Sequence, residues 1–199
     1  MTLDLFLALL GFAFVSSITP GPNNLMLMAS GANFGVRRTL PHMLGVSLGH
    51  GFMVFLVGLG LGRVFDAYPQ VRLVMLALCT AYLLYLAWKI ANAAAPREAA
   101  AEARPFTFLQ AAAFQWVNPK AVYMAITAQT YYAAPDSGWT GAAAVAGGFA
   151  LVNLPSVSVW VWTGTKIRRW LARPARLRAF NWTMAGLLVL TLVPIWWPA

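Results

Sequence analysis

Six long apolar runs follow one another along the chain, and short polar connections separate them. A helix needs about 20 apolar residues to cross the hydrocarbon core of a bilayer, and the runs have about this length. They extend over Leu3–Ala29, Leu40–Gly62, Val71–Ala91, Phe106–Tyr132, Gly141–Thr165 and Phe180–Trp197. The pattern predicts an all-α integral membrane protein with six transmembrane helices, in which residues 1–199 form a single transmembrane domain.

Proline interrupts the first and fourth runs near their middle. The first run contains Pro20, Gly21, Pro22, Asn23 and Asn24, and the fourth contains Asn118, Pro119 and Lys120. Proline frees backbone groups that hydrocarbon cannot solvate, so such breaks persist only where protein or a water-filled cavity surrounds them. Two breaks in corresponding positions of two halves are typical of a secondary transporter whose substrate site lies between repeats.

The two halves share one plan, a broken first helix followed by two further helices. Residues 1–92 and 105–199 are therefore predicted to be two three-helix repeats. Three crossings are an odd number, so the second repeat enters from the opposite face of the membrane. The sequence predicts a 3+3 inverted repeat with helices 1 and 4 broken by proline.

The charges of the chain lie mainly in the connections. Only 10% of residues are charged, and the formal net charge is +9. Eleven basic residues fall on one side of the predicted membrane: Arg37, Arg38, Lys89, Arg97, Arg104, Lys166, Arg168, Arg169, Arg173, Arg176 and Arg178. By the positive-inside rule this side faces the cytoplasm, and both termini are periplasmic. This placement explains the positive charge without a nucleic-acid partner, and membrane lipid is the expected surrounding.

Lys120 is the charged residue placed deepest in an apolar run, where a charge is costly. Beside the helix start at Pro119 it combines a cation with the positive end of a helix dipole, which favours an anionic group such as a carboxylate. The Asn118 region belongs to the same candidate site. The alternative is that Lys120 snorkels to an interface or makes a structural pairing.

The first break offers groups of the opposite kind. Pro20, Gly21 and Pro22 expose backbone carbonyls, while Asn23 and Asn24 supply both donors and acceptors. This break suits an ammonium as well as a carboxylate, although either asparagine could simply cap the second half-helix.

Other polar groups lie at membrane depth, namely Gln115, Asn153 and His50, and Gln115 joins the predicted substrate site. His50 is a candidate for proton coupling because imidazole titrates near neutral pH, and Asp4 is a second candidate. A packing role for His50 remains the alternative.

Enzyme, metal and cofactor chemistry find little support. Gly45-Val46-Ser47-Leu48-Gly49 matches a nucleophile-elbow pattern, but that motif needs a strand-to-helix turn, and here it lies in an apolar helix. The single cysteine, Cys79, and two separated histidines do not form a metal-ligand cluster. No catalytic residue, metal site or cofactor is expected.

The residues of the two breaks resemble those of the lysine exporter superfamily, in its homoserine/threonine exporter branch. Further carriers of the resemblance are the glycine-rich segment 57–62, the segment 81–88 and the segment 114–121. The segment 88–91 with Asn23 and Asn24 adds a likeness to cysteine/O-acetylserine exporters. The resemblance implies proton-driven efflux of amino acids or close derivatives across the bacterial inner membrane.

The scarcity of acidic residues favours a small neutral zwitterion over a cationic substrate such as lysine.

Three other functional classes compete with an amino-acid exporter: an intramembrane hydrolase, an inorganic cation exporter and an importer of the same substrates. A homodimer stays open, because a second copy of the chain can complete a bundle of six short spans.

Overall fold

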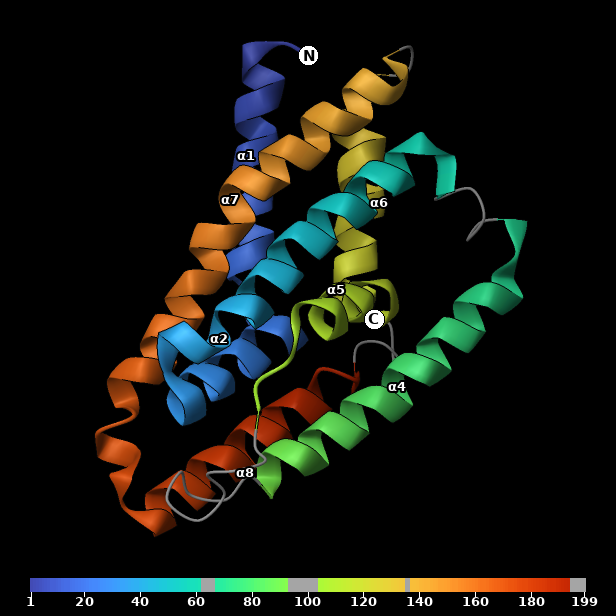
Figure 1. The fold of residues 1–199 in the computed structure, drawn as a ribbon. Coiled ribbons are helices and arrows are strands. Elements are labelled where there is room, and N and C mark those ends of the chain that lie inside the picture. Colours follow the sequence, from blue (N-terminus) through green and yellow to red (C-terminus); the bar gives the residue numbers. More distant parts are fainter. Residues whose placement is uncertain (62–66, 93–103, 135–136, 194–199) are drawn as a thin grey trace.

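The computed structural model describes residues 1–61, 67–92, 104–134 and 137–193. Every regular element in this part of the chain is helical, as predicted (Figure 1). The elements are α1 Leu3–Ile18, α2 Pro22–Leu56, the π-helical turn η1 Val57–Leu61, α4 Pro69–Ala91, α5 Phe108–Val117, α6 Pro119–Tyr132, α7 Gly138–Ile167, the 3₁₀ turn η2 Trp170–Ala172 and α8 Pro174–Leu190.

Both predicted breaks are present. Helix α1 ends at Ile18 and α2 begins at Pro22, while α5 ends at Val117 and α6 begins at Pro119. Proline suits the first position of a helix because its fixed φ matches the helix and the amide hydrogen that it lacks would have no partner there. The prolines therefore start the second half of each broken run.

Helix α2 contains a sharp turn at Gly35, which has a φ of 77°. This left-handed conformation is strained for a residue with a Cβ but accessible to glycine. The ribbon of α2 reverses its direction within the helix (Figure 1). The link between the first and second apolar runs is thus helical on both sides of one residue, and Arg37 and Arg38 lie exposed just beyond the turn.

Two helical stretches are long and apolar enough to cross a membrane, Pro22–Leu61 and Gly138–Ile167, among the residues that the structure describes. Leu3–Ile18 and Leu76–Ala91 are shorter apolar helices. The breaks account for part of the difference from six, because they divide the first and fourth runs into helices below the required length of about 20 residues. The six-span inverted repeat stays a prediction. Arg97, the connector between the halves and the end of the sixth run lie outside the described residues.

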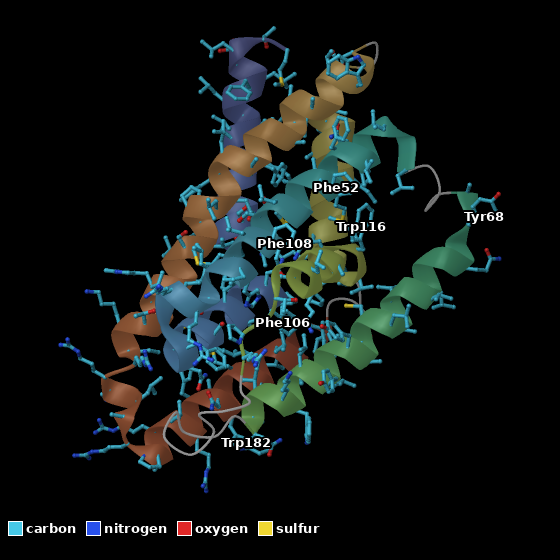
Figure 2. All side chains as sticks on the ribbon, in the orientation of Figure 1. Phe52, Tyr68, Phe106, Phe108, Trp116 and Trp182 are labelled. Atoms are coloured by element: carbon cyan, nitrogen blue, oxygen red, sulfur yellow. The ribbon has the colours of Figure 1, made fainter. Side chains whose placement is uncertain are left out.

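Close helix contacts bring the two breaks together. On α2, a Cβ at Gly49 would lie 2.5 Å from the Cα of Ala112 on α5, so only glycine permits this approach. Nearby, Phe52 of α2 and Trp116 of α5 pack edge to face with ring centroids 6.5 Å apart (Figure 2). Helices α4 and α8 form a second layer around buried residues that include Cys79 and Leu188. The buried Cys79 is a packing residue in this layer.

Candidate functional site

The end of α1 exposes backbone carbonyls that have no partner within the helix. Side chains from other elements bind them. The amide nitrogen of Asn24 donates to the carbonyl oxygens of Ser17 at 2.7 Å and Thr19 at 2.8 Å. The indole nitrogen of Trp160 on α7 donates to the carbonyl oxygen of Ile18 at 3.1 Å. Asn24 therefore caps the C-terminal end of α1. This differs from the expected cap of the second half-helix, because the N-cap residue of α2 is Gly21, which makes no side-chain capping bond.

Lys120 reaches the same break from α6. Its Nζ donates to the carbonyl oxygen of Thr19 at 2.7 Å and to that of Pro20 at 3.3 Å. A cation is favourable at this position because the C-terminal end of a helix carries a partial negative charge. In this structure Lys120 therefore ties the second break to the first, across 100 residues of sequence, which is the structural pairing named as the alternative for this residue.

Gly21 makes room for this contact. A Cβ at Gly21 would lie 2.9 Å from Cδ of Lys120 and 3.2 Å from its Nζ. The φ of Gly21 is −179°, an extended conformation that any residue adopts. Glycine thus leaves room here for the lysine side chain, and the backbone conformation does not require it.

A second contact between the breaks joins Asn23 to Gln115. The Asn23 amide donates to Oε1 of Gln115 at 2.8 Å, and the Gln115 amide donates back to Oδ1 of Asn23 at 3.2 Å. Gln115 also donates to the carbonyl oxygen of Ala111 at 2.8 Å. The fully buried Gln115 is held in one orientation by these bonds.

Asn118 forms the second break almost without a loss of backbone hydrogen bonds. Its N–H donates to the carbonyl oxygen of Phe114, and its own carbonyl accepts from the N–H of Val122, both at 3.0 Å. The side chain is buried, yet Oδ1 has no hydrogen-bond partner among the described residues. Asn118 thus presents a polar atom whose bonding capacity is unused.

A small cavity of about 30 Å³ lies beside the two breaks. This is space for water but not for an amino acid. His50 lines the cavity together with Asn118 and Lys120, and neither ring nitrogen of the buried imidazole has a partner among the described residues. The other lining residues are Ser16, Ser17, Gly21, Pro22, Asn23, Asn24, Val46, Ala121, Met124, Asn153 and Val157.

The chain matches the family described as LysE type translocator over residues 6–193. This match covers nearly the whole sequence. The chain belongs to the LysE family. The resemblance inferred from the two breaks is thereby confirmed, and the family match makes the chain a membrane transporter and not an enzyme.

Several curated relatives of this LysE-family chain share one name. A cysteine/O-acetylserine efflux protein of Klebsiella pneumoniae is 29% identical over 198 residues, which is 98% of each chain. Proteins of the same name from Escherichia coli strain K12 and Shigella sonnei are each 30% identical over 138 residues, 69% of this chain and 70% of theirs. No solved structure matches the chain.

Three hydrogen-bonded polar residues, one on each of α1, α2 and α7, were not among the predicted residues of this LysE-family site. Ser47 of α2 donates to Oδ1 of Asn153 on α7 at 3.0 Å, and the Asn153 amide donates to Oγ of Ser17 on α1 at 3.2 Å. Asn153 was visible as a polar residue in an apolar run, but its partners were not. The Ser47 hydroxyl is engaged by Asn153, so it is not the activated nucleophile that its motif suggests.

The two candidates for proton coupling do not come together. His50 lines the cavity, whereas Asp4 lies exposed in the first turn of α1. At 1.5 Å per residue, Asp4 is about 21 Å along the helix axis from Ile18 at the break.

Most of the predicted substrate-site residues line the cavity, namely Gly21, Pro22, Asn23, Asn24, Asn118 and Lys120. Pro20 and Gln115 contact lining residues, and Pro119 starts α6 beside them.

Proposed function

We propose that the chain is a secondary active exporter of small neutral amino acids or their derivatives across the bacterial inner membrane. The observation that carries this proposal is the meeting of two broken helices at Lys120, beside a small cavity that polar side chains help to line. Broken helices at the centre of a transporter provide unpaired backbone groups and helix ends for a charged substrate. The names of the relatives favour cysteine and O-acetylserine as substrates, with homoserine and threonine as the second candidates.

The substrate carboxylate binds the ammonium of Lys120 and the N-terminal end of α6 near Asn118 and Pro119. Both carry positive charge, one as a full cation and one as the end of a helix dipole. The segment from Pro20 to Asn24 faces the amino group or the side chain of the substrate. Gln115 supports this segment through its hydrogen bonds with Asn23.

A neutral zwitterion suits the charge of the site. Asp4 is the only acid among the described residues, and it lies at the far end of α1. A cationic substrate would add a second positive charge beside Lys120 without a carboxylate to balance it, which is costly at membrane depth. A zwitterion adds no net charge.

Transport requires the cavity to widen, because its present volume of about 30 Å³ cannot hold an amino acid. In the proposed cycle, the repeats 1–92 and 105–199 rock against each other about the two breaks, as inverted repeats allow. The site then opens to the cytoplasm for loading and to the periplasm for release.

His50 is the proposed carrier of the coupled proton. It lines the cavity, and its two ring nitrogens are unpartnered among the described residues, so either can exchange a proton when water enters. Lys120 is the other titratable residue that lines the cavity. Asp4 is left as a second candidate at the periplasmic end. A His50→Gln variant is expected to retain substrate binding and lose the dependence of export on the proton gradient.

Uptake into inverted membrane vesicles tests the proposal. The panel consists of labelled cysteine, O-acetylserine, homoserine, threonine and lysine, with rubidium as an inorganic cation. We expect accumulation of one or more neutral amino acids that stops when a protonophore collapses the proton gradient. Uptake of the inorganic cation without any amino acid would overturn the proposal.

The orientation is tested separately. With eleven basic residues predicted on the cytoplasmic side, a reporter that is active only in the periplasm should be active when fused after Ala199 and silent when inserted near Ala99. The opposite result would reverse the proposed orientation.

Sedimentation of the purified protein in detergent distinguishes a monomer from the homodimer that the short spans allow.

A further inference from the structure

An ammonium group already occupies the carbonyl end of α1. Nζ of Lys120 lies 2.7 Å from the oxygen of Thr19 and 3.3 Å from that of Pro20. These oxygens stand at the negative end of a helix dipole, where a cation is stabilised. The structure thus contains a cation subsite, and its present occupant comes from the protein itself.

The contact balances the charge of Lys120 only with neutral carbonyl groups. The cavity beside it is lined by no acidic residue among those that the structure describes. A carboxylate that reaches the cavity carries a full negative charge, and a hydrogen bond between two ions is stronger than one between an ion and a neutral carbonyl. The ammonium of Lys120 therefore turns from the carbonyls to an arriving carboxylate.

This movement would leave the oxygens of Thr19 and Pro20 without their cation. Giving up hydrogen bonds to a charged donor is unfavourable. An α-amino acid brings a replacement with it, because its own ammonium is separated from its carboxylate by a single carbon atom. That group has the same charge and the same three donors as the ammonium of lysine.

We propose that substrate binding is an exchange of cations, in which the α-ammonium of the substrate replaces Lys120 on the carbonyl oxygens of Thr19 and Pro20 while Lys120 takes the substrate carboxylate. This inference rests on the proposed function and adds the recognition chemistry of the site. The net charge stays constant throughout the exchange, and no carbonyl loses its partner.

The exchange selects molecules that carry both groups on one carbon. A compound with a carboxylate and no ammonium draws Lys120 away but leaves the two carbonyls unpaired. A compound with an ammonium and no carboxylate offers Lys120 no new partner. The tie that Lys120 makes between the two breaks is thus released fully only by a zwitterion.

Two isomers provide a matched pair of ligands. O-acetylserine has a free α-ammonium, whereas N-acetylserine consists of the same atoms and has none. In mildly acidic buffer, we expect purified wild-type protein to bind O-acetylserine at least about tenfold more tightly than N-acetylserine. This factor corresponds to the loss of one hydrogen bond that involves a charged group. Equal affinities would overturn the exchange. If neither isomer nor any other amino acid binds or is exported, the proposed function itself fails.

Gly21→Ala tests the same exchange from the protein side. The added methyl group would meet Cδ and Nζ of Lys120 at 2.9 and 3.2 Å while the extended backbone stays unstrained. It pushes the ammonium off the carbonyls and partly fills the cation subsite. The preference for O-acetylserine over N-acetylserine should therefore shrink.

Gly11→Ala on α1 is the matched control, because a Cβ there meets nothing within 4 Å, and it should keep the wild-type preference. A Gly21→Ala protein that folds and keeps the full preference would contradict the exchange. If Gly21→Ala does not fold, the two isomers measured on the wild-type protein still decide the question.

Discussion

The two breaks differ in how they deal with their backbone. The first opens the chain over Thr19, Pro20 and Gly21, and its carbonyls depend on side chains from elsewhere. The second is confined to Asn118, whose backbone still donates to Phe114 and accepts from Val122. One break therefore accepts hydrogen bonds, and the other supplies a donor, Lys120.

This difference shows that two similar sequence signals have taken complementary roles. If the halves are repeats, as we propose, their broken helices have diverged into an acceptor and a donor that fit each other. The contact between the two breaks therefore joins two different surfaces and not two copies of the same one. It brings the negative, carbonyl end of the α1 dipole close to the positive, amino end of the α6 dipole.

The largest effect on stability is expected at the first break. Asn24→Ala removes two hydrogen bonds and leaves the buried carbonyl of Ser17 without its donor, which should lower the free energy of unfolding by about 2 to 4 kcal/mol. Asn23→Ala, the comparison variant, breaks the two reciprocal bonds with Gln115, whose amide keeps its bond to the carbonyl of Ala111, and should cost less, about 1 to 2 kcal/mol. Thermal melting in detergent compares them, and equal losses would refute the capping role of Asn24.

A second prediction concerns the contact between α2 and α5, the helix that ends at the second break. Gly49→Ala places a methyl group against the backbone of Ala112, so α5 must shift, at a cost of about 1 to 3 kcal/mol. The shift also draws Lys120 away from the carbonyls, and substrate affinity should fall with stability. Gly147→Ala, where a Cβ meets nothing within 4 Å, should be neutral. A stable Gly49→Ala protein would show that the approach of α5 to α2 is looser than described.

The smallest effect is expected at Trp160. Trp160→Phe keeps an aromatic ring but removes the donor to the carbonyl of Ile18, a loss of about 0.5 to 1.5 kcal/mol in unfolding free energy. Substrate affinity should stay unchanged, because Trp160 does not line the cavity that Lys120 lines. A drop in affinity without a drop in melting temperature would assign Trp160 to the substrate site instead.

Local sequence signals were sufficient for the breaks and for the residues around them. Proline within an apolar run removes a backbone donor, and the combinations with glycine and asparagine at Pro20 to Asn24 and Asn118 to Pro119 marked the ends of α1 and α5. Proline alone was not sufficient, because α7 continues through Pro155. Lys120 and Asn118 were recognisable because a charge and an amide are costly at such positions. The helical class and the family followed from the same patterns.

Partners across the fold were not predictable. Nothing in the run around Lys120 indicates that its ammonium meets Thr19, because the contact depends on how α6 packs against α1. The bond between Ser47 and Asn153 was not predictable for the same reason, since it depends on how α2 packs against α7. The turn at Gly35 was also missed, because one glycine in a polar stretch does not distinguish a helical reversal from a loop.

Substrate binding to purified Lys120→Met protein tests the central claim that Lys120 joins the two breaks into one substrate site. Methionine keeps much of the side-chain volume but removes a charge-assisted interaction of about 1.5 to 3 kcal/mol, so the affinity for the exported amino acid should weaken by about 10 to 150-fold. Lys120→Arg should rescue poorly, because its planar guanidinium does not fit the place of an ammonium.

Lys89→Met is the control in this measurement, since Lys89 is exposed at the end of α4, and it should bind like the wild type. Wild-type affinity and export by a well-folded Lys120→Met protein would contradict the account.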